Sequence, residues 1–364
     1  MDAIADSLAF YESLTDAECE EKIVSTKQIL GNKLAILGHH YQREEVFKHA
    51  DFTGDSLKLS REAAQSQAQY IVFCGVHFMA EVADILSRPD QVVVLPDLSA
   101  GCSMADMANL AKVLRAWEDL NQVLDAESKV TPVTYINSAA DLKAFCGRHG
   151  GIVCTSSNAG KILDWSFAQK EKVLFFPDEH LGRYTGYRMG IPLAEMAVWD
   201  PDKPMGGLTE EVIEKSRIFL WKGFCSVHQL FAKNHIDRFR EKYPEGKVIA
   251  HPECNFEVCM HADEVGSTEY IIKTIADSPA GTTWLVGTEL NLVMRLAKRF
   301  APENKSIRFM APMICQCSTM ARIDPQHLAW CLDRLALGQV VNRIIVPCED
   351  RQDAKTALER MLAL

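Results

Sequence analysis

The sequence predicts an α/β protein built from three homologous three-layer α/β/α domains, with parallel sheets around a pseudo-threefold axis. Short apolar runs alternate with helical patterns along the chain, which is typical of β-α units and a parallel sheet. The alternation also repeats three times, and each repeat opens with a lysine, an apolar run and a polar pair. The three openings read KLAILGHHYQ, KVTPVTYINS and KVIAHPECN. Such a repeat predicts three copies of one structural unit.

The length of the chain, 364 residues, suits two or three domains. We expect the first domain to span residues 1–115, with an N-terminal helix followed by the first repeat. The second domain is expected at 116–230 and the third at 231–340. The C-terminal segment 341–364 contains an amphipathic helix, which we expect to pack on a neighbouring sheet and to join the first domain.

Composition and charge narrow the classes of function. Hydrophobic residues make up 48% of the chain and charged residues 24%, as in a soluble globular protein with a sizeable core. The net charge of −10 disfavours binding to nucleic acid or to anionic membranes, because both need a basic surface. No apolar run reaches the roughly 18 residues of a membrane span, and the acidic N-terminus does not resemble a signal peptide. We therefore expect a cytoplasmic protein with neither a membrane nor a nucleic-acid partner.

Each repeat places a pair of polar residues at the end of its first predicted strand. The members of a pair are two residues apart, so both side chains leave the strand on the same face. Open α/β sheets bind their ligands outside the carboxyl ends of the strands, and histidine, tyrosine and glutamate can transfer protons there. The pairs are His39 and Tyr41, Tyr135 and Asn137, and His251 and Glu253.

The second strand of each repeat passes into a helix through small hydroxyl residues. Free N–H groups and a partial positive charge at a helix N-terminus favour a carboxylate or a phosphate there. Serine and threonine are also common N-caps, so capping alone explains any single turn of this kind. Three such turns in register favour a role in anion binding. The residues are Ser56, Ser156 with Ser157, and Ser267 with Thr268.

Most of the twelve cysteines are expected to be small buried residues with reduced thiols. Three differ, since each follows the fourth apolar strand of its repeat, where a helix is expected to begin. They are Cys102, Cys225 and either Cys315 or Cys317. Cys317 is favoured because serine follows it, as serine follows Cys102 and Cys225, whereas glutamine follows Cys315.

Three thiolates that converge in a reducing compartment favour a soft metal, either zinc or an iron–sulfur cluster. A structural zinc takes four ligands, and no fourth residue recurs in all three repeats. His228, three residues after Cys225 on the same predicted helical face, is a possible fourth ligand. Three cysteines suit a [4Fe–4S] cluster with one iron left open, which could bind a substrate oxygen as a Lewis acid. The pattern therefore favours the cluster over zinc.

With these residues in place, the chain resembles the quinolinate synthase (NadA) family from about Lys33 to the C-terminus. The resemblance rests on HHYQ, DFTGDSLKLS, GVHFMAE, VTYINS, CTSSNA, PDEHLGRY, HPEC, EVGST and a C-x-x-M at Cys317, in that order. It implies three α/β/α domains and a [4Fe–4S] cluster held by one cysteine from each domain. It also implies an enzyme that condenses iminoaspartate with dihydroxyacetone phosphate, releasing phosphate and water, to give quinolinate for de novo NAD biosynthesis. L-Aspartate oxidase, which supplies iminoaspartate, would be a functional partner.

The resemblance also assigns roles to individual residues. We expect Glu253 and Tyr41 to share proton transfer, and histidines to orient or protonate intermediates. The implied cluster ligands are Cys102, Cys225 and Cys317, and Cys315 is a bystander. The implied catalytic residues are His39, Tyr41, Tyr135, His228, His251 and Glu253. The implied substrate-binding residues are His39, Ser56, Tyr135, Asn137, Ser156, His251, Glu253, Ser267 and Thr268.

Two other functions fit part of the pattern. An aconitase-type hydro-lyase also uses a three-cysteine cluster, but its cysteines include a C-x-x-C pair that this chain lacks. A non-catalytic iron–sulfur sensor would not need the polar pairs at the strand ends. A sensor of nucleic acid would also require a basic patch or a helix-turn-helix, and this acidic chain offers neither.

Overall fold

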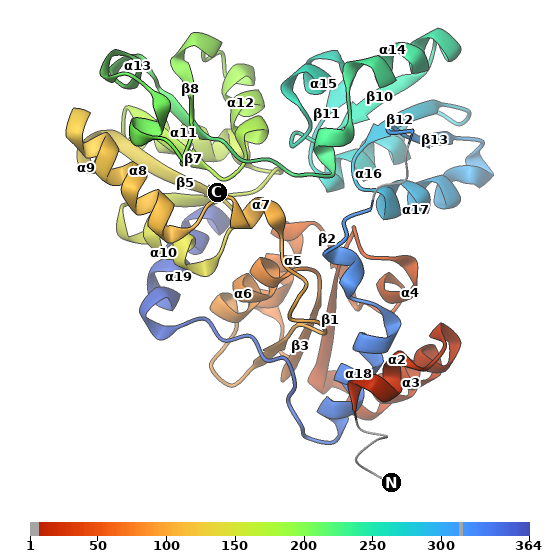
Figure 1. The fold of residues 1–364 in the computed structure, drawn as a ribbon. Helices are drawn as coiled ribbons and strands as arrows, with labels where there is room; N and C mark the ends of the chain where they lie inside the picture. Colours follow the sequence, from red (N-terminus) through yellow and green to blue (C-terminus); the bar gives the residue numbers. More distant parts are fainter. Residues whose placement is uncertain (1–6, 313–315) are drawn as a thin grey trace. The chain divides into compact units, whose positions relative to one another are not determined.

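The chain folds into three parallel β-sheets flanked by α-helices, in a computed structural model that describes residues 7–312 and 316–364 (Figure 1). The predicted α/β class with parallel sheets is confirmed. The chain divides into two compact units, of which unit 1 holds the first sheet and unit 2 holds the second and third. Unit 1 comprises Met1–Cys102, Leu290–Leu292 and Gln316–Val346, and unit 2 comprises Ser103–Glu289, Val293–Cys315 and Pro347–Leu364. The limits of three separate domains and the threefold axis stay predictions.

The first sheet has four parallel strands in the order β2-β1-β3-β4. Its strands are β1 (Leu34–His39), β2 (Phe52–Gly54), β3 (Tyr70–Cys74) and β4 (Val92–Val94). The helices of unit 1 are α2 (Leu8–Glu12), α3 (Asp16–Leu30), η1 (Gly31–Lys33), α4 (Glu44–Phe47), α5 (Ser56–Gln65), α6 (His77–Leu86), η6 (Met320–Arg322) and α18 (Pro325–Ala336). α3 packs against α18, where the carboxylate of Asp333 accepts hydrogen bonds from Tyr11 and Thr26.

The second sheet has five parallel strands in the order β6-β5-β7-β9-β8. Its strands are β5 (Val130–Tyr135), β6 (Ile152–Cys154), β7 (Lys172–Phe176), β8 (Met196–Trp199) and β9 (Ile218–Trp221). The helices in this part of unit 2 are α7 (Ser103–Asp106), α8 (Leu110–Val123), α9 (Ala126–Lys129), α10 (Ala140–Arg148), α11 (Ala159–Gln169), α12 (Glu179–Arg188), η2 (Leu193–Glu195), η3 (Pro204–Gly207), α13 (Glu210–Lys215), η4 (His228–Leu230) and α19 (Cys348–Leu362).

The third sheet also has four parallel strands, in the order β11-β10-β12-β13. Its strands are β10 (Lys247–Ala250), β11 (Glu264–Val265), β12 (Thr283–Gly287) and β13 (Ser306–Phe309). The accompanying helices are α14 (Lys233–Lys242), α15 (Phe256–His261), α16 (Thr268–Asp277), α17 (Leu290–Phe300) and η5 (Ala301–Glu303).

The three sheets share the order of their first three strands. Counted along the chain, the first and third sheets have the strand order 2-1-3-4. The second sheet has the order 2-1-3-5-4, because its fourth strand, β8, lies beyond its fifth, β9. The chain order of strands therefore reverses next to β1, β5 and β10. In parallel α/β sheets, the carboxyl end of the sheet at such a reversal is the usual place for a ligand. The internal repeat seen in the sequence is thus a repeat of topology.

The central strands are buried on both faces, as expected for parallel sheets covered by helices. Every residue of β1, β5, β7 and β9 is buried. Side-chain caps set the starts of several helices, because a capping oxygen satisfies an N–H that has no partner within the helix. Thr15 and Glu18 form a complete capping box at α3, and Asp55 and Ser267 cap α5 and α16.

The C-terminal segment contributes to both units. Within unit 1, Ile344 donates its backbone N–H to Val93 of β4 over 2.9 Å. Within unit 2, α19 packs closely on α10, where a Cβ on Gly147 would lie 2.0 Å from the backbone oxygen of Asp353. An ion pair of 2.8 Å between Arg148 Nε and Asp353 Oδ2 lies at the same contact.

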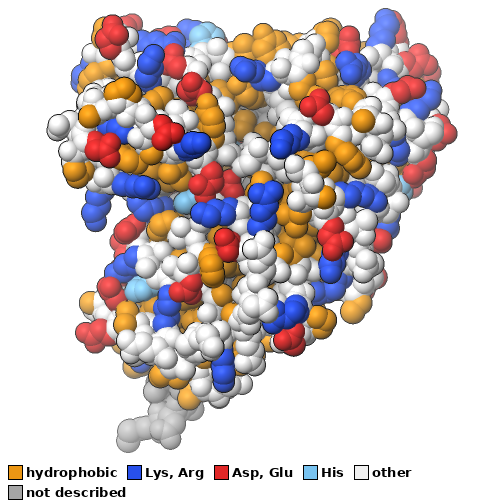
Figure 2. Space-filling view, turned by 180° about the vertical axis from the view of Figure 1, so that it is seen from behind, with side chains coloured by type: hydrophobic (Ala, Val, Ile, Leu, Met, Phe, Trp, Pro, Cys, Tyr) orange, Lys and Arg blue, Asp and Glu red, His pale blue; other side chains and the backbone are white. Residues whose placement is uncertain are grey.

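None of the described helices has the length and apolar character that crossing a membrane requires. On the face of the molecule in Figure 2, lysine and arginine side chains are interspersed with aspartate and glutamate. This mixed surface accompanies a formal net charge of −10 for the whole chain.

Candidate active site

Four of the predicted catalytic residues meet in unit 2, around the carboxylate of Glu253. Tyr135 is the last residue of β5, and His251 and Glu253 follow β10 directly. The hydroxyl of Tyr135 donates to Glu253 Oε1 over 2.5 Å, and His228 Nδ1 lies 3.0 Å from Glu253 Oε2. All four side chains are buried, at 1–4% exposure. The carboxylate therefore accepts a hydrogen bond from Tyr135 on one oxygen and has the imidazole of His228 within ion-pair distance of the other.

The turn after β10 fixes the geometry of His251. The backbone N–H of Glu253 donates to His251 Nδ1 over 3.3 Å, so the neutral ring carries its proton on Nε2. That nitrogen lies 3.2 Å from Ser156 Oγ, in the hydroxyl turn after β6. Two buried thiols form hydrogen bonds next to this turn. Cys259 donates to the backbone oxygen of His251, and Cys254 donates to that of Gly287 at the end of β12.

His228 lies against His251 but carries its proton on the other nitrogen. The two rings stack with centroids 4.9 Å apart and 28° between their planes. The contact of Nδ1 with the Glu253 carboxylate places the proton of His228 on Nδ1. Its Nε2 lies 3.5 Å from Thr288 Oγ1, a residue that follows β12. Sequence reasoning missed Thr288, although VGTE ends the third strand of its repeat.

Burial and hydrogen bonding set the protonation states of this group. Burial lowers the pKa of His251 to about 3, so this ring is neutral at pH 7. Burial alone would raise the pKa of Glu253, but the neighbouring His251 and His228 and the hydrogen bonds from His228 and Tyr135 outweigh it. They lower the pKa of Glu253 to about 2, so the carboxylate is ionised at pH 7.

Asn137 follows β5 two residues after Tyr135, as predicted. Its side-chain Oδ1 is buried and has no hydrogen-bond partner among the described residues. Behind this turn, the Ser138 hydroxyl donates to the backbone oxygen of Tyr135 over 2.9 Å, and the buried Lys143 ammonium donates to the backbone oxygen of Ser138. A rigid turn therefore presents a buried acceptor, and such an acceptor normally has a partner in a working protein.

The predicted hydroxyl turns all lie where a second strand passes into a helix. Ser267 is the N-cap of α16, and its hydroxyl accepts a hydrogen bond from the backbone N–H of Tyr270 over 3.3 Å. Thr268 is the first residue of that helix. Capping does not explain Ser56, because Asp55 is the N-cap of α5. It does not explain Ser156 either, because that hydroxyl faces His251.

In unit 1, the first polar pair has the same local geometry as the third. The backbone N–H of Tyr41 donates to Nδ1 of His39 over 3.1 Å, as that of Glu253 does to His251. The His39 ring is buried and meets the Tyr41 ring edge to face, with centroids 4.7 Å apart. This repeated contact leaves Nε2 as the protonated nitrogen of a neutral His39 as well.

The predicted cluster ligands differ from the other cysteines in exposure. Of the eleven described cysteines, Cys102, Cys225 and Cys317 are half-buried, while one is exposed and seven are buried. Burial raises the pKa of the buried thiols, for example to about 12 for Cys74 and Cys259, and a protonated thiol is a poor metal ligand. Cys315 lies outside the described residues.

The three half-buried cysteines occupy equivalent places in the fold. Cys102 lies between β4 and α7, Cys225 between β9 and η4, and Cys317 between β13 and η6. Each therefore follows the strand at the fourth position across its sheet, which is β4, β9 or β13. These are the apolar strands after which the sequence predicts a cysteine. Sequence reasoning placed Cys225 and His228 on one helix, but Cys225 lies in the loop before η4. One atom each of Cys225, His228 and Glu253 lie within 4.8 Å of one another, so this group could hold a metal ion.

Comparison with known proteins matches this arrangement to one family. The sequence model of the family described as quinolinate synthetase A protein matches residues 21–363. The chain belongs to this family. A protein of Acidobacterium capsulatum called quinolinate synthase is 53% identical over 360 residues, which cover 99% of this chain and 96% of that protein.

Other relatives of the same name are as similar. The quinolinate synthase of Rhodopirellula baltica is 55% identical over 97% of this chain and 93% of its own length. That of Streptomyces coelicolor is 54% identical over 97% of this chain and 90% of its own length. The likeness extends over nearly the full length of each protein.

The loop that carries Cys225 is held in place by neighbouring segments of unit 2. Glu179 donates its backbone N–H to the oxygen of Gly223 over 2.9 Å. A Cβ on Gly223 would lie 2.2 Å from the backbone oxygen of Pro177, so only glycine fits this approach. The indole of Trp221 donates to the backbone oxygen of Met107 over 3.0 Å.

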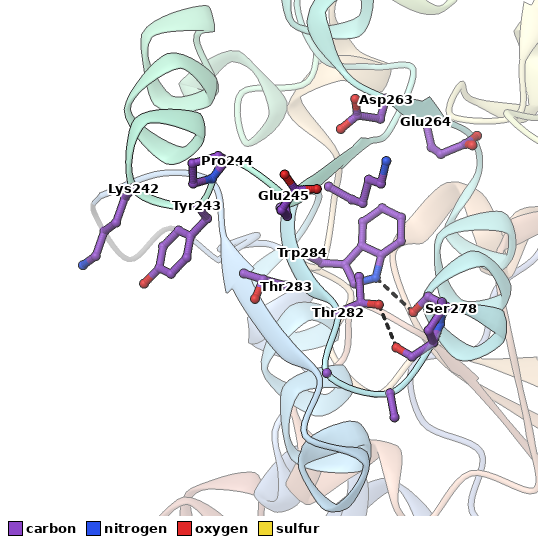
Figure 3. A pocket seen from close by; sticks show the side chains of 15 residues that line it. Lys242, Tyr243, Pro244, Glu245, Asp263, Glu264, Ser278, Thr282, Thr283 and Trp284 are labelled. Carbon is purple, nitrogen blue, oxygen red and sulfur yellow. Dashed lines mark hydrogen bonds between the residues drawn. The ribbon is translucent and has the colours of Figure 1, made fainter.

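Two surface pockets lie at the amino ends of strands, whereas the predicted strand-end pairs lie at the carboxyl ends. The larger, of about 770 Å³, surrounds Trp284 and includes Lys247 and Thr283 at the starts of β10 and β12 (Figure 3). The smaller, of about 370 Å³, includes Leu34 and Ala35 at the start of β1. Because the two occupy equivalent places in the first and third sheets, we attribute them to the repeated fold. None of the predicted site residues lines either pocket.

Proposed function

We propose that this protein is a quinolinate synthase, which condenses iminoaspartate with dihydroxyacetone phosphate and releases phosphate and water in de novo NAD biosynthesis. The observation that carries the proposal is the buried carboxylate of Glu253, with Tyr135 hydrogen-bonded to one oxygen, His228 3.0 Å from the other and Cys225 close by. Membership of the quinolinate synthetase A family supports it, as do the names of the relatives. The reaction needs several proton transfers, and this group offers an ionised carboxylate beside Tyr135 and the neutral His251.

The substrates carry two carboxylates and a phosphate between them, and the hydroxyl turns suit these anions. Ser56, Ser267 and Thr268 lie at the first turns of α5 and α16, where backbone N–H groups and the helix dipole favour negative charge. Ser156 and the Nε2–H of His251 add donors in unit 2. The buried Oδ1 of Asn137 is an acceptor for a hydroxyl or amine group of a substrate.

The three half-buried cysteines fit a [4Fe–4S] cluster. Cys102, Cys225 and Cys317 would be its ligands, one from each repeat, which leaves one iron without a protein thiolate. When bound, the cluster supplies a Lewis acid that polarises a substrate oxygen. The alternative of zinc would use Cys225, His228 and Glu253, whose ligand atoms also lie close together. The cluster is favoured because it accounts for all three equivalent cysteines.

The residues around Glu253 have complementary tasks in this proposal. Glu253 takes a proton from the condensing intermediates, and Tyr135 and His228 hold the carboxylate in a single orientation. His251 presents Nε2–H to an oxygen of the substrate, and His39 does the same in unit 1. Tyr41 shares the proton transfers with Glu253. The functional link to L-aspartate oxidase and the cytoplasmic location stay predictions.

Anaerobic reconstitution with iron and sulfide tests the proposal directly. We expect about four irons and four sulfides per chain and formation of quinolinate from iminoaspartate and dihydroxyacetone phosphate. A protein that retains zinc, or that binds the cluster but makes no quinolinate, would contradict the proposal. Dehydration of a hydroxy acid such as citrate by the same preparation would instead favour the aconitase-type hydro-lyase.

A further inference from the structure

Asp178 is a buried carboxyl group in unit 2 to which no role has been assigned. It follows β7, the strand that lies between β5, which ends at Tyr135, and β9, which precedes the Cys225 loop. The side chain is fully buried. Its Oδ1 accepts from the backbone N–H of Leu181 over 2.7 Å and so caps α12. Its Oδ2 has no hydrogen-bond partner among the described residues.

The surroundings of Asp178 do not favour a negative charge. No lysine, arginine or histidine of the described residues forms an ion pair with it, and an unpaired buried carboxylate is strongly disfavoured. Burial, followed by the negative charge of Glu253, raises the pKa of Asp178 well above its ordinary range. Hydrogen bonds from the backbone N–H groups of Leu181 and His180 lower the pKa of Asp178, and the negative charge of Glu179 raises it further. Two nearby carboxyl groups thus have pKa values that are pushed apart.

His180 is the natural partner for a proton on Asp178. It lies two residues later in the same turn, and its Nδ1 is buried without a hydrogen-bond partner among the described residues. Burial lowers the pKa of His180, so the ring is neutral. Gln229 opposes this lowering of the pKa of His180. The Nε2 of Gln229 lies 3.5 Å from the backbone oxygen of Glu253. The turn therefore connects Asp178 to the residue that carries the ionised carboxylate.

We propose that Asp178 is a neutral, proton-bearing positioning residue of the active site, whose Oδ2 hydroxyl donates towards Nδ1 of His180. Both atoms are buried, and a carboxyl hydroxyl and an unprotonated imidazole nitrogen are complementary as donor and acceptor. The proton on Asp178 leaves Glu253 as the one ionised member of this pair of carboxyl groups. That matters for a site whose substrates are themselves anions, because a second buried negative charge would repel them. This inference rests on the proposed function.

Infrared spectroscopy of the reconstituted full-length protein tests the protonation of Asp178 without any turnover. We expect the C=O stretch of a protonated carboxyl group at neutral pH in the wild type, and its loss in Asp178→Asn. The same band should persist in Glu253→Gln, because Glu253 is ionised. A band that survives in Asp178→Asn, or that is absent from the wild type, would overturn the proposal.

Two capping variants separate a positioning role from helix capping alone. Both Asn and Ser are good N-caps, but only Asn keeps a donor at the place of Oδ2. We expect Asp178→Asn to keep kcat/KM close to the wild-type value and Asp178→Ser to lower it roughly tenfold, with the cluster retained in both. Equal activity of the two variants would show that Asp178 is only a cap. A loss in Asp178→Asn as large as that in Glu253→Gln would show that Asp178 acts as an ionised base.

These measurements also separate this inference from the proposed function. A wild-type protein that makes no quinolinate but shows the band would contradict the function and leave the protonation of Asp178 intact. A protein that makes quinolinate but lacks the band would support the function and contradict the protonation of Asp178.

Discussion

The imidazole rings of His228 and His251 stack at 4.9 Å, and Glu253 contacts the Nδ1 atom of both. His228 Nδ1 lies 3.0 Å from the Glu253 carboxylate, and His251 accepts at Nδ1 from the backbone N–H of the same residue. Glu253 is therefore the residue that fixes both rings. Its side chain orients one histidine and its backbone orients the other.

Replacing Glu253 by Gln tests the central role of this carboxylate. We expect a loss of about 10²–10⁴-fold in kcat, because the variant lacks the proton acceptor and faces His228 and Tyr135 with an uncharged amide. Iron content and melting temperature should change little. The exposed Glu257→Gln in α15 is the matched control and should behave as wild type. Near-normal turnover by Glu253→Gln would remove this residue from the mechanism.

The buried neutral His251 should make stability depend on pH. Its pKa is lowered from 6.5 to about 3 in the folded protein, so the unfolded chain binds the extra proton as pH falls below 6.5. The contribution is fully present above that pH and is progressively lost down to about pH 3. Between pH 6.5 and 5.5 it amounts to about 1 kcal/mol.

The variant His251→Gln should remove this part of the pH dependence. Melting temperatures measured between pH 7.5 and 5.5 should fall less steeply in the variant than in the wild type. His261→Gln, in the more exposed last turn of α15, should keep the wild-type slope. Parallel slopes for all three proteins would show that His251 is already protonated or is solvated in the folded state.

The sequence predicts the repeated parts of this site better than the contacts between them. Strand-end pairs such as His251 and Glu253 were predictable because side chains alternate along a strand and parallel strands end at one edge. The equivalent positions of Cys102 and Cys225 were predictable for the same reason. The approach of His228 to Glu253 was not predictable, because the loop after β9 and the short 3₁₀ helix η4, rather than an α-helix, bring it there.

Other features lack any local signal in the sequence. The edge strand β8 is only four residues long and was not predicted. Nothing in the sequence singles out Asp178, because an aspartate before a helix is indistinguishable from an ordinary N-cap until its burial and its distant neighbours are known. The opposite protonation of Asp178 and Glu253 depends on tertiary burial, which spacing along the chain does not report.

The cysteine assignments predict which variants lose iron. Cys102→Ser, Cys225→Ser and Cys317→Ser should each lose the visible absorbance and most of the iron of the reconstituted protein, since one ligand of three is removed. The exposed Cys348→Ser is the control and should keep both. Cys315→Ser should also keep its cluster. If Cys315→Ser loses iron while Cys317→Ser retains it, the third ligand has to be reassigned to Cys315.

The packing of α19 on α10 gives a prediction about stability. An alanine at Gly147 would place its Cβ 2.0 Å from the backbone oxygen of Asp353, so the two helices would have to move apart. We expect Gly147→Ala to lower the free energy of unfolding by about 1–3 kcal/mol. Gly160→Ala in α11 is the matched control, because its Cβ would meet no atom within 4 Å. Alanine is the better helix former by about 1 kcal/mol, so that variant should be unchanged or more stable. Equal stability of the two variants in urea would show that α19 does not pack on α10 in solution.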